Sequence, residues 1–133
     1  MSENVDLANR WLRGLNRGDV CTELWDPDLT VANPPEWAFE RTYRGHAGLR
    51  RWWQQFTDPF SEVEIEIDEV RELDDGRVLT VQTLRGRFRA TGLPAELTWA
   101  GIGTVRNGKI VHADGYASKR RALRAAGLSA SQG

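Results

Sequence analysis

The chain contains few of the residues that build disulfides and metal sites. Its 133 residues include one cysteine, Cys21, and two histidines, His46 and His112. A single cysteine excludes an internal disulfide and suits a reducing compartment, and we expect it to be a small buried hydrophobe. These three residues offer no spacing typical of metal ligands. The sequence therefore predicts no metal and no cofactor.

An excess of charge of one sign is also lacking, as are long apolar runs. The formal net charge is -1, from 18 basic and 19 acidic residues, so nothing indicates a nucleic-acid or anionic-membrane partner. No apolar run approaches the roughly 18 residues of a membrane span. The first residues do not follow the pattern of a signal peptide. We expect a single cytoplasmic domain over residues 1–133.

Tryptophan is the residue that stands out, with six copies, two of them adjacent. Leu49, Trp52, Trp53 and Phe56 fall at i, i+3, i+4 and i+7, which predicts a helix with one broad apolar face. Such a face either fills a core or walls an apolar pocket. The residues of this segment leave both interpretations open.

The remaining elements follow from hydrophobic periodicity and turn residues. Helices are predicted at residues 3–16 and 20–25, before and after a turn that contains Gly18, and a short strand at 29–33. A loop at 36–45 is long enough to be a lid. Four further strands and a last short helix are predicted at residues 63–73, 77–89, 96–105, 109–118 and 122–128. This order indicates an α+β fold with three N-terminal helices packed on a curved, four-to-five-stranded, mostly antiparallel sheet, and a short C-terminal helix.

Four segments carry a resemblance to a known family: Leu15–Asp19, Trp25–Val31, Tyr43–Trp53 and Asn107–Val111. Their order and spacing resemble the nuclear-transport-factor-2-like cone, and within it the SnoaL-like (polyketide-cyclase-like) proteins and their relative ketosteroid isomerase. The resemblance covers nearly the whole chain and implies a conical cavity between sheet and helices. Isomerases, cyclases, dehydratases, epoxide hydrolases and non-enzymatic binders share this cone, so the fold does not supply the function.

The working positions of these relatives hold other residues in this chain. The aspartate base of ketosteroid isomerase is matched by Asn33, which cannot accept a proton. Its oxyanion tyrosine is matched by Trp11, a poorer and bulkier donor, and its oxyanion aspartate by Gly101. SnoaL-type cyclases place a histidine near that last point and an aspartate near Gly115. The usual acid-base chemistry of these relatives is therefore not expected.

The last strand has two different faces, and the sequence does not settle which one lines the cavity. One face is small and apolar and the other is mostly polar: Val111, Ala113, Gly115 and Ala117 against Ile110, His112, Asp114 and Tyr116. The burial rule turns the small face inward. A slip of one residue or a β-bulge would turn the polar face inward instead. If the polar face is outside, His112 and Tyr116 with Ile102 predict a homodimer that pairs through the sheet.

The preferred hypothesis is a domain that binds a hydrophobic, aromatic or polycyclic small molecule in an aromatic-lined cavity. Gly101 and Gly103 remove volume opposite the tryptophan helix, or else relieve a bent strand. Arg85 lies on the face of its strand expected to point inward, where it would meet an anion, or else it reaches solvent. The predicted ligand-binding residues are Trp11, Asn33, Tyr43, Trp52, Trp53, Phe56, Arg85, Trp99 and Gly101. A cone packed solid, with no cavity above about 300 Å³, would overturn this hypothesis.

The alternative is an enzyme of the cyclase, isomerase or dehydratase type that uses relocated acid-base groups. The candidates are Asp114, His112, Tyr43 and His46. At least one of them must come within hydrogen-bond reach of a bound ligand.

Overall fold

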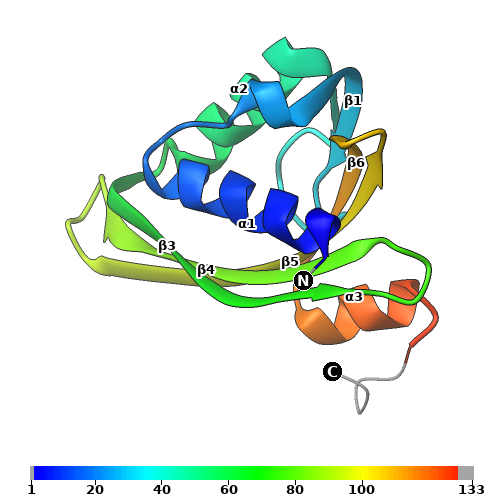
Figure 1. The fold of residues 1–133 in the computed structure, drawn as a ribbon. Helices are drawn as coiled ribbons and strands as arrows, with labels where there is room; N and C mark the ends of the chain where they lie inside the picture. The colour runs from blue at the N-terminus through cyan, green and yellow to red at the C-terminus, as the bar shows by residue number, and fades with distance from the viewer. Residues whose placement is uncertain (1, 129–133) are drawn as a thin grey trace.

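The structure is a computed structural model that describes residues 2–128, and Figure 1 shows its α+β architecture. The helical elements are α1 (Glu3–Asn16), the 3-10 turn η1 (Thr22–Leu24), α2 (Gly45–Thr57) and α3 (Lys119–Ala125). The strands are β1 (Trp25–Ala32), β2 (Thr42–Arg44), β3 (Phe60–Glu72), β4 (Val78–Phe88), β5 (Pro94–Arg106) and β6 (Lys109–Tyr116). The predicted α+β class is confirmed, and its details differ.

All six strands form one mixed sheet in the order β2-β1-β6-β5-β4-β3. Neighbours are antiparallel except β1 and β6, which run parallel and bring the first and last strands together. The prediction of four to five strands missed β2, which occupies the end of the expected loop at 36–45. The predicted helix at 20–25 was wrong beyond residues 22–24, because β1 begins at Trp25. Pro27 is tolerated in this strand because it lies where the pairing with β6 is interrupted.

The sheet is covered on both faces. Figure 1 shows α1 and α2 on one side of it and α3 on the other. The larger core cluster lies on the side of α1 and α2 and contains Trp11, Trp52 and Trp99. A smaller cluster lies beneath α3, where Ala122 and Leu123 pack with residues of β4 and β5. Apolar residues are therefore required on both faces of the central strands.

This double burial reverses the predicted faces of β4. Cross-strand partners place Thr80 opposite Gly101 and Gln82 opposite Trp99, on the side of α1 and α2. Leu79 and Val81 share by alternation the face of Arg85, which was expected to point inward, and they lie instead in the cluster under α3. Seven consecutive residues of β4, from Val78 to Leu84, are buried, so alternation of hydrophobicity could not identify the inner face.

The helix α3 also changes the surface predicted to form a homodimer. Ile102 is 2% exposed because it lies under α3, and Tyr116 packs against the same cluster. Ile102 is therefore not part of an exposed stripe. Pairing of two copies through other parts of the sheet stays a prediction. None of the helices within residues 2–128 is both long and apolar enough to cross a membrane.

The helix α1 begins and ends where the sequence predicts. The Ser2 Oγ atom accepts hydrogen bonds from the backbone N–H groups of Asn4 and Val5 at 3.1 and 3.2 Å, which caps the first turn. The chain leaves the last turn through Gly18, at a φ of 76°. It then turns back so that Cys21, 3% exposed, packs beside the helix. A Cβ atom on Gly14 would lie only 2.1 Å from the Cys21 Sγ atom.

We expect Gly14→Ala to destabilise the protein, although alanine is normally the better helix former by about 1 kcal/mol. The added methyl group overlaps Cys21, and overpacking of this kind costs about 1–3 kcal/mol. Urea unfolding of the single variants and of Gly14→Ala/Cys21→Ala gives the coupling between the two sites. Most of the loss should be recovered in the double variant. A Gly14→Ala protein more stable than the parent would contradict the packing seen here.

Candidate functional site

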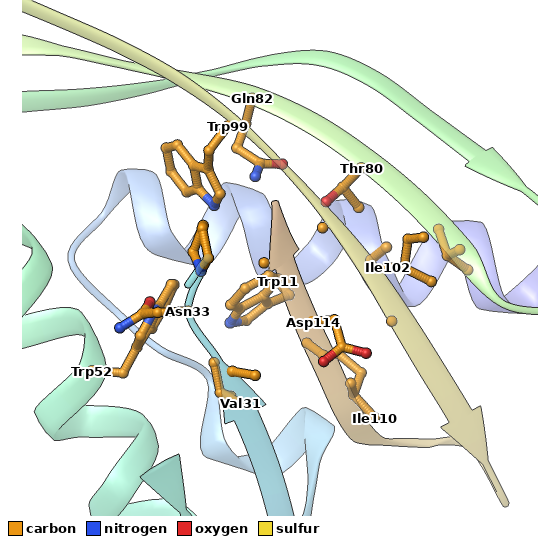
Figure 2. Close-up of a pocket in the computed structure, with 18 of the residues that line it drawn as sticks. Trp11, Val31, Asn33, Trp52, Thr80, Gln82, Trp99, Ile102, Ile110 and Asp114 are labelled. Carbon is orange, nitrogen blue, oxygen red and sulfur yellow. The ribbon is translucent and has the colours of Figure 1, made fainter. Parts of the chain in front are cut away.

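A cavity of about 60 Å³ lies between the sheet, α1 and α2, and we call it the aromatic chamber. Figure 2 shows Trp11, Trp52 and Trp99 around it, with Thr80 and Gln82 on the adjacent strand. Its lining comes from α1, β1 and the following loop, α2, β4, β5 and β6. Among the lining residues are Trp11, Trp25, Val31, Asn33, Pro34, Trp37, Trp52, Val78, Thr80, Gln82, Trp99, Gly101, Gly103, Ile110, Ala113, Asp114 and Gly115.

The tryptophans both fill the core and wall the chamber. The Trp11 ring stacks on Trp52 with centroids 5.9 Å apart and meets Trp25 edge-on at 5.2 Å. Phe56 lies behind them, edge-on to Trp99 at 4.7 Å. Offset and edge-to-face aromatic pairs of this kind hold rings in fixed orientations. The walls are therefore rigid apolar surfaces.

Three buried polar atoms on the chamber residues have no hydrogen-bond partner within residues 2–128. They are the Nε1 atoms of Trp11 and Trp25 and the Oε1 atom of Gln82. Leaving a buried donor or acceptor unsatisfied costs about 1–3 kcal/mol. Such groups are normally satisfied by protein, ordered water or ligand. These two donors and one acceptor belong to residues that line the chamber.

Asn33, in contrast, has its side chain fully engaged by the protein. Its Oδ1 atom accepts a hydrogen bond from Trp52 Nε1 at 3.0 Å. Its Nδ2 atom donates to the Glu40 carbonyl at 2.9 Å and to the Tyr43 hydroxyl at 3.3 Å. Asn33 lines the chamber as predicted, and it orients Trp52 and the loop after β1.

Tyr43 lies behind Asn33 and outside the residues that line the chamber. Its hydroxyl donates to the Gln55 Oε1 atom at 2.6 Å, and burial raises the pKa of Tyr43. The adjacent Glu40 accepts hydrogen bonds from Arg51 Nε at 2.9 Å and from Gln55 Nε2 at 3.0 Å. The hydrogen bond from Arg51 is the main reason that the pKa of Glu40 is lowered. These contacts fasten the loop to α2.

The three glycines predicted to matter lie at the chamber, for different reasons. A Cβ atom on Gly103 would meet only the His112 carbonyl, at 3.9 Å, and one on Gly101 would lie 3.2 Å from Thr80 Oγ1. A Cβ atom on Gly115 would lie 3.0 Å from both the Ala32 carbonyl and the Pro34 ring. Gly115 is therefore required by the close approach of the loop, whereas Gly103 leaves open volume.

The register of β6 divides its two faces. Ala113 lies opposite Gly103, and Gly115 opposite Gly101, on the chamber side. Asp114 lies opposite Ile102, and His112 opposite Thr104, so both side chains belong to the face that α3 covers in part. The face with small residues is thus the inner one from Gly115 back to Ala113.

A register shift between Thr104 and Val105 changes the faces at the start of β6. Beyond it Ile110 pairs with Val105, and both line the chamber. The expectation that Ile110 points outward was wrong, because this bulge adds one residue to β6 and turns its first part over.

Among residues 2–128, Asp114 is the only ionisable residue that lines the chamber. Its main-chain oxygen lies 3.5 Å from the position of a Cβ atom on Gly101, on the chamber side. Its carboxylate is paired with His112, with Oδ1 and Nε2 3.0 Å apart. The His112 Nδ1 atom is in turn hydrogen-bonded to Thr30 Oγ1. The register therefore turns the acid-base group of Asp114 and His112 away from the chamber.

Four other predicted residues do not line the chamber. Arg85 is exposed and forms ion pairs with Glu66 and Glu96, because the inner face of β4 is the opposite one. His46 Nε2 lies 3.0 Å from the Trp25 carbonyl, so this side chain is hydrogen-bonded to the backbone of β1. Trp53 and Phe56 are buried in the core next to the chamber. Within the described residues no group of three or more His, Cys, Asp or Glu is placed to hold a metal.

Trp25, Trp37, Thr80 and Gln82 are among the chamber residues that the sequence did not predict. Trp25 was missed because it was predicted to end a helix. Thr80 and Gln82 were missed because the inner and outer faces of β4 were predicted the wrong way round. Trp37 lies on the loop after β1, where no periodicity exists. A buried glutamine inside a run of β-branched and leucine residues was the signal available for Gln82.

Residues 8–113 match the SnoaL-like domain. No protein with a curated description matches the chain. A nuclear-transport-factor-2-like protein of unknown function from Burkholderia pseudomallei has a similar structure, with a TM-score of 0.75 and 19% identity over 93% of this chain and 97% of that one.

Two further solved structures are similar and contain small molecules. TerC, co-crystallized with polyporic acid, has a TM-score of 0.74 and 20% identity, covering 88% of this chain and 92% of its own. A protein with a ketosteroid isomerase-like fold from Catenulispora acidiphila, in complex with trimethylamine, has a TM-score of 0.69 and 19% identity over 95% of each chain. At these identities the likeness shows the fold alone. The match over residues 8–113 shows the family: the chain belongs to the SnoaL-like domain family.

Proposed function

We propose that the protein binds a small, flat, mostly apolar molecule with a hydrogen-bond acceptor in the aromatic chamber. The observation that carries this proposal is the pair of buried, unpartnered indole donors on Trp11 and Trp25. A ligand carbonyl or similar acceptor would satisfy a donor that otherwise costs about 1–3 kcal/mol. The unpartnered Gln82 Oε1 atom would accept from a donor on the same ligand.

The size of the chamber limits what enters it. Its volume of about 60 Å³ is below the roughly 300 Å³ at which ligand pockets begin, so the predicted ready-made cavity for an aromatic or polycyclic ligand is absent from the chamber in this form. Trp37 is the wall best able to move. It lies outside helix and strand, is only half-buried, and stacks on Phe56 at 5.4 Å. A cavity that binds benzene has about 150 Å³, so binding of even a single ring requires Trp37 to swing out.

Two similar structures support a small-molecule role, since one was crystallized with polyporic acid and another with trimethylamine. The chamber walls add a physical reason, because rigid aromatic faces suit flat ligands at low entropic cost. A size series of ketones tests this: acetophenone, acetonaphthone and acetylanthracene, each against its ethyl-substituted hydrocarbon. Calorimetry should show binding of the one-ring ketone in preference to its hydrocarbon. No binding by any member would overturn the proposal.

We expect Trp11→Phe to weaken acetophenone binding by about tenfold, because it removes one indole donor and keeps an aromatic ring. One hydrogen bond contributes about 0.5–1.5 kcal/mol, and tenfold corresponds to 1.4 kcal/mol. The matched control is Trp53→Phe, the same replacement at a buried tryptophan that does not line the chamber. Its dissociation constant, measured by calorimetry, should stay within about twofold of the parent. Equal losses in both variants would place the effect in the core instead of the site.

We expect Gly103→Val to abolish ketone binding and to leave the fold intact. The new side chain enters open volume on a strand, where a β-branched residue is well accommodated. Thermal unfolding should be unchanged or slightly raised, since filling a cavity commonly stabilises a protein. A variant that is stable and still binds acetophenone with the parent affinity would show that the ligand lies elsewhere.

A second candidate is a cyclase, isomerase or dehydratase type enzyme, and the observation that favours it is that Asp114 lines the chamber. The register turns its carboxylate to the other face, so we expect Asp114→Asn to change the affinity for acetophenone less than about twofold. A calorimetric loss of more than about tenfold would place the carboxylate at the ligand and favour the enzyme. His112→Gln, which keeps Asp114, separates this effect from loss of the ion pair.

A further inference from the structure

A second site lies on the other side of the loop that carries Trp37. A surface groove of about 810 Å³ runs between residues 35–36 and α3. Arg120, Arg121 and Arg124 line it from the exposed face of α3, and Glu36 lines it from the loop. Ala122 and Leu123, on the opposite face of α3, bury their side chains against the sheet. The three arginines thus lie on one side of the groove, on a helix whose opposite face is packed against the sheet.

The groove has more positive than negative charge. Of the described part of the chain, Glu36 is the only acidic residue that lines it, and its carboxylate pairs with Arg121. Arg120 and Arg124 have no ion-pair partner within residues 2–128. Tyr116 adds a hydroxyl to the groove, and burial, followed by the Asp114 carboxylate, raises the pKa of Tyr116. It is therefore a neutral donor at physiological pH.

We propose that this groove is a binding site for a small oxyanion, a phosphate or carboxylate group, and that the Glu36 carboxylate takes the place of that group in the empty protein. Guanidinium groups bind such anions through paired, charge-assisted hydrogen bonds. Glu36 already shows one carboxylate bound to Arg121 in the groove. A free anion with two or three charged oxygens can engage Arg121 together with Arg120 or Arg124.

Displacing Glu36 has a consequence for the aromatic chamber. Glu36 is next to Trp37 in the chain, and the two side chains serve opposite sides of one loop: the groove and the chamber. An anion that competes for Arg121 removes one of the contacts that fix this loop, so it should favour the outward position of Trp37. The anion site does not rest on the small-molecule proposal, and either can fail alone.

The test uses inorganic phosphate on the full chain, titrated by two-dimensional amide NMR at constant ionic strength with chloride as the balancing ion. Constant ionic strength removes general screening. Shifts should appear at Ser118, Arg120, Arg121 and Glu36. Arg124→Gln should weaken phosphate binding by about tenfold, as expected for loss of a charged hydrogen-bond donor. The matched control is Arg106→Gln, an exposed arginine on a distant hairpin, which should retain the parent affinity.

Glu36 competes with the anion for Arg121, and this competition gives a second readout that a general effect of surface charge would not produce. Glu36→Gln should tighten phosphate binding by up to about fivefold, the worth of an exposed ion pair. Glu72→Gln, which changes the net charge equally at an exposed site on β3, should not. Absence of shifts in the groove, or equal effects of the target and control variants, would overturn the proposal. Benzoate in place of phosphate distinguishes a carboxylate-selective site from a phosphate-selective one.

Discussion

The side chain of Asn33 is the contact on which the chamber depends. It joins the end of β1 to Trp52 on α2, to the Tyr43 hydroxyl next to that helix, and to the backbone of the loop at Glu40. Asn33 is 3% exposed, so each of these bonds forms where an unpaired partner is costly. A single amide thus orients one aromatic wall and fixes the loop that closes the chamber. An aspartate here would lack the two amide donors, and the same network could not form.

The residue types around the chamber show why ligand binding is favoured over acid-base chemistry. The indole donors and the glutamine oxygen that remain unpartnered do not titrate. The acid-base side chains nearby, Asp114 and His112, are paired with each other on the other face of β6. The Tyr43 hydroxyl donates its proton in a hydrogen bond to Gln55. A polar group that is buried, neutral and unpaired can bind a ligand or an ordered water, whereas proton transfer needs an ionisable group at the same place.

The sequence predicted α1 to the residue and the tryptophan stripe of α2, because long amphipathic helices and their caps are local signals. It also placed Trp11, Asn33, Trp52, Trp99 and Gly101 in one cavity, and the structure brings these residues together. It failed where a second layer or a bulge decides orientation. The burial of Leu79 by α3 reversed the faces of β4, and the register shift at Thr104 reversed Ile110. Neither event leaves a trace in the local hydrophobic pattern, since both depend on partners distant in the chain.

The loop after β1 contacts the chamber, α2 and α3, and hydrophobic periodicity does not predict these contacts. Its Trp37 side chain closes the chamber, Glu36 faces the arginines of α3, and Glu40 binds Arg51 of α2. Two of these three anchors are exposed ion pairs, each worth no more than about 1 kcal/mol. The third is an aromatic stack of Trp37 on Phe56. Asn33 anchors the loop at the Glu40 carbonyl, so it is the stretch between these two residues, which carries Glu36 and Trp37, that can open without disturbing the core beneath it. Under the proposed function, the rigid walls would select the shape of a ligand, and the loop that carries Trp37 would control its entry.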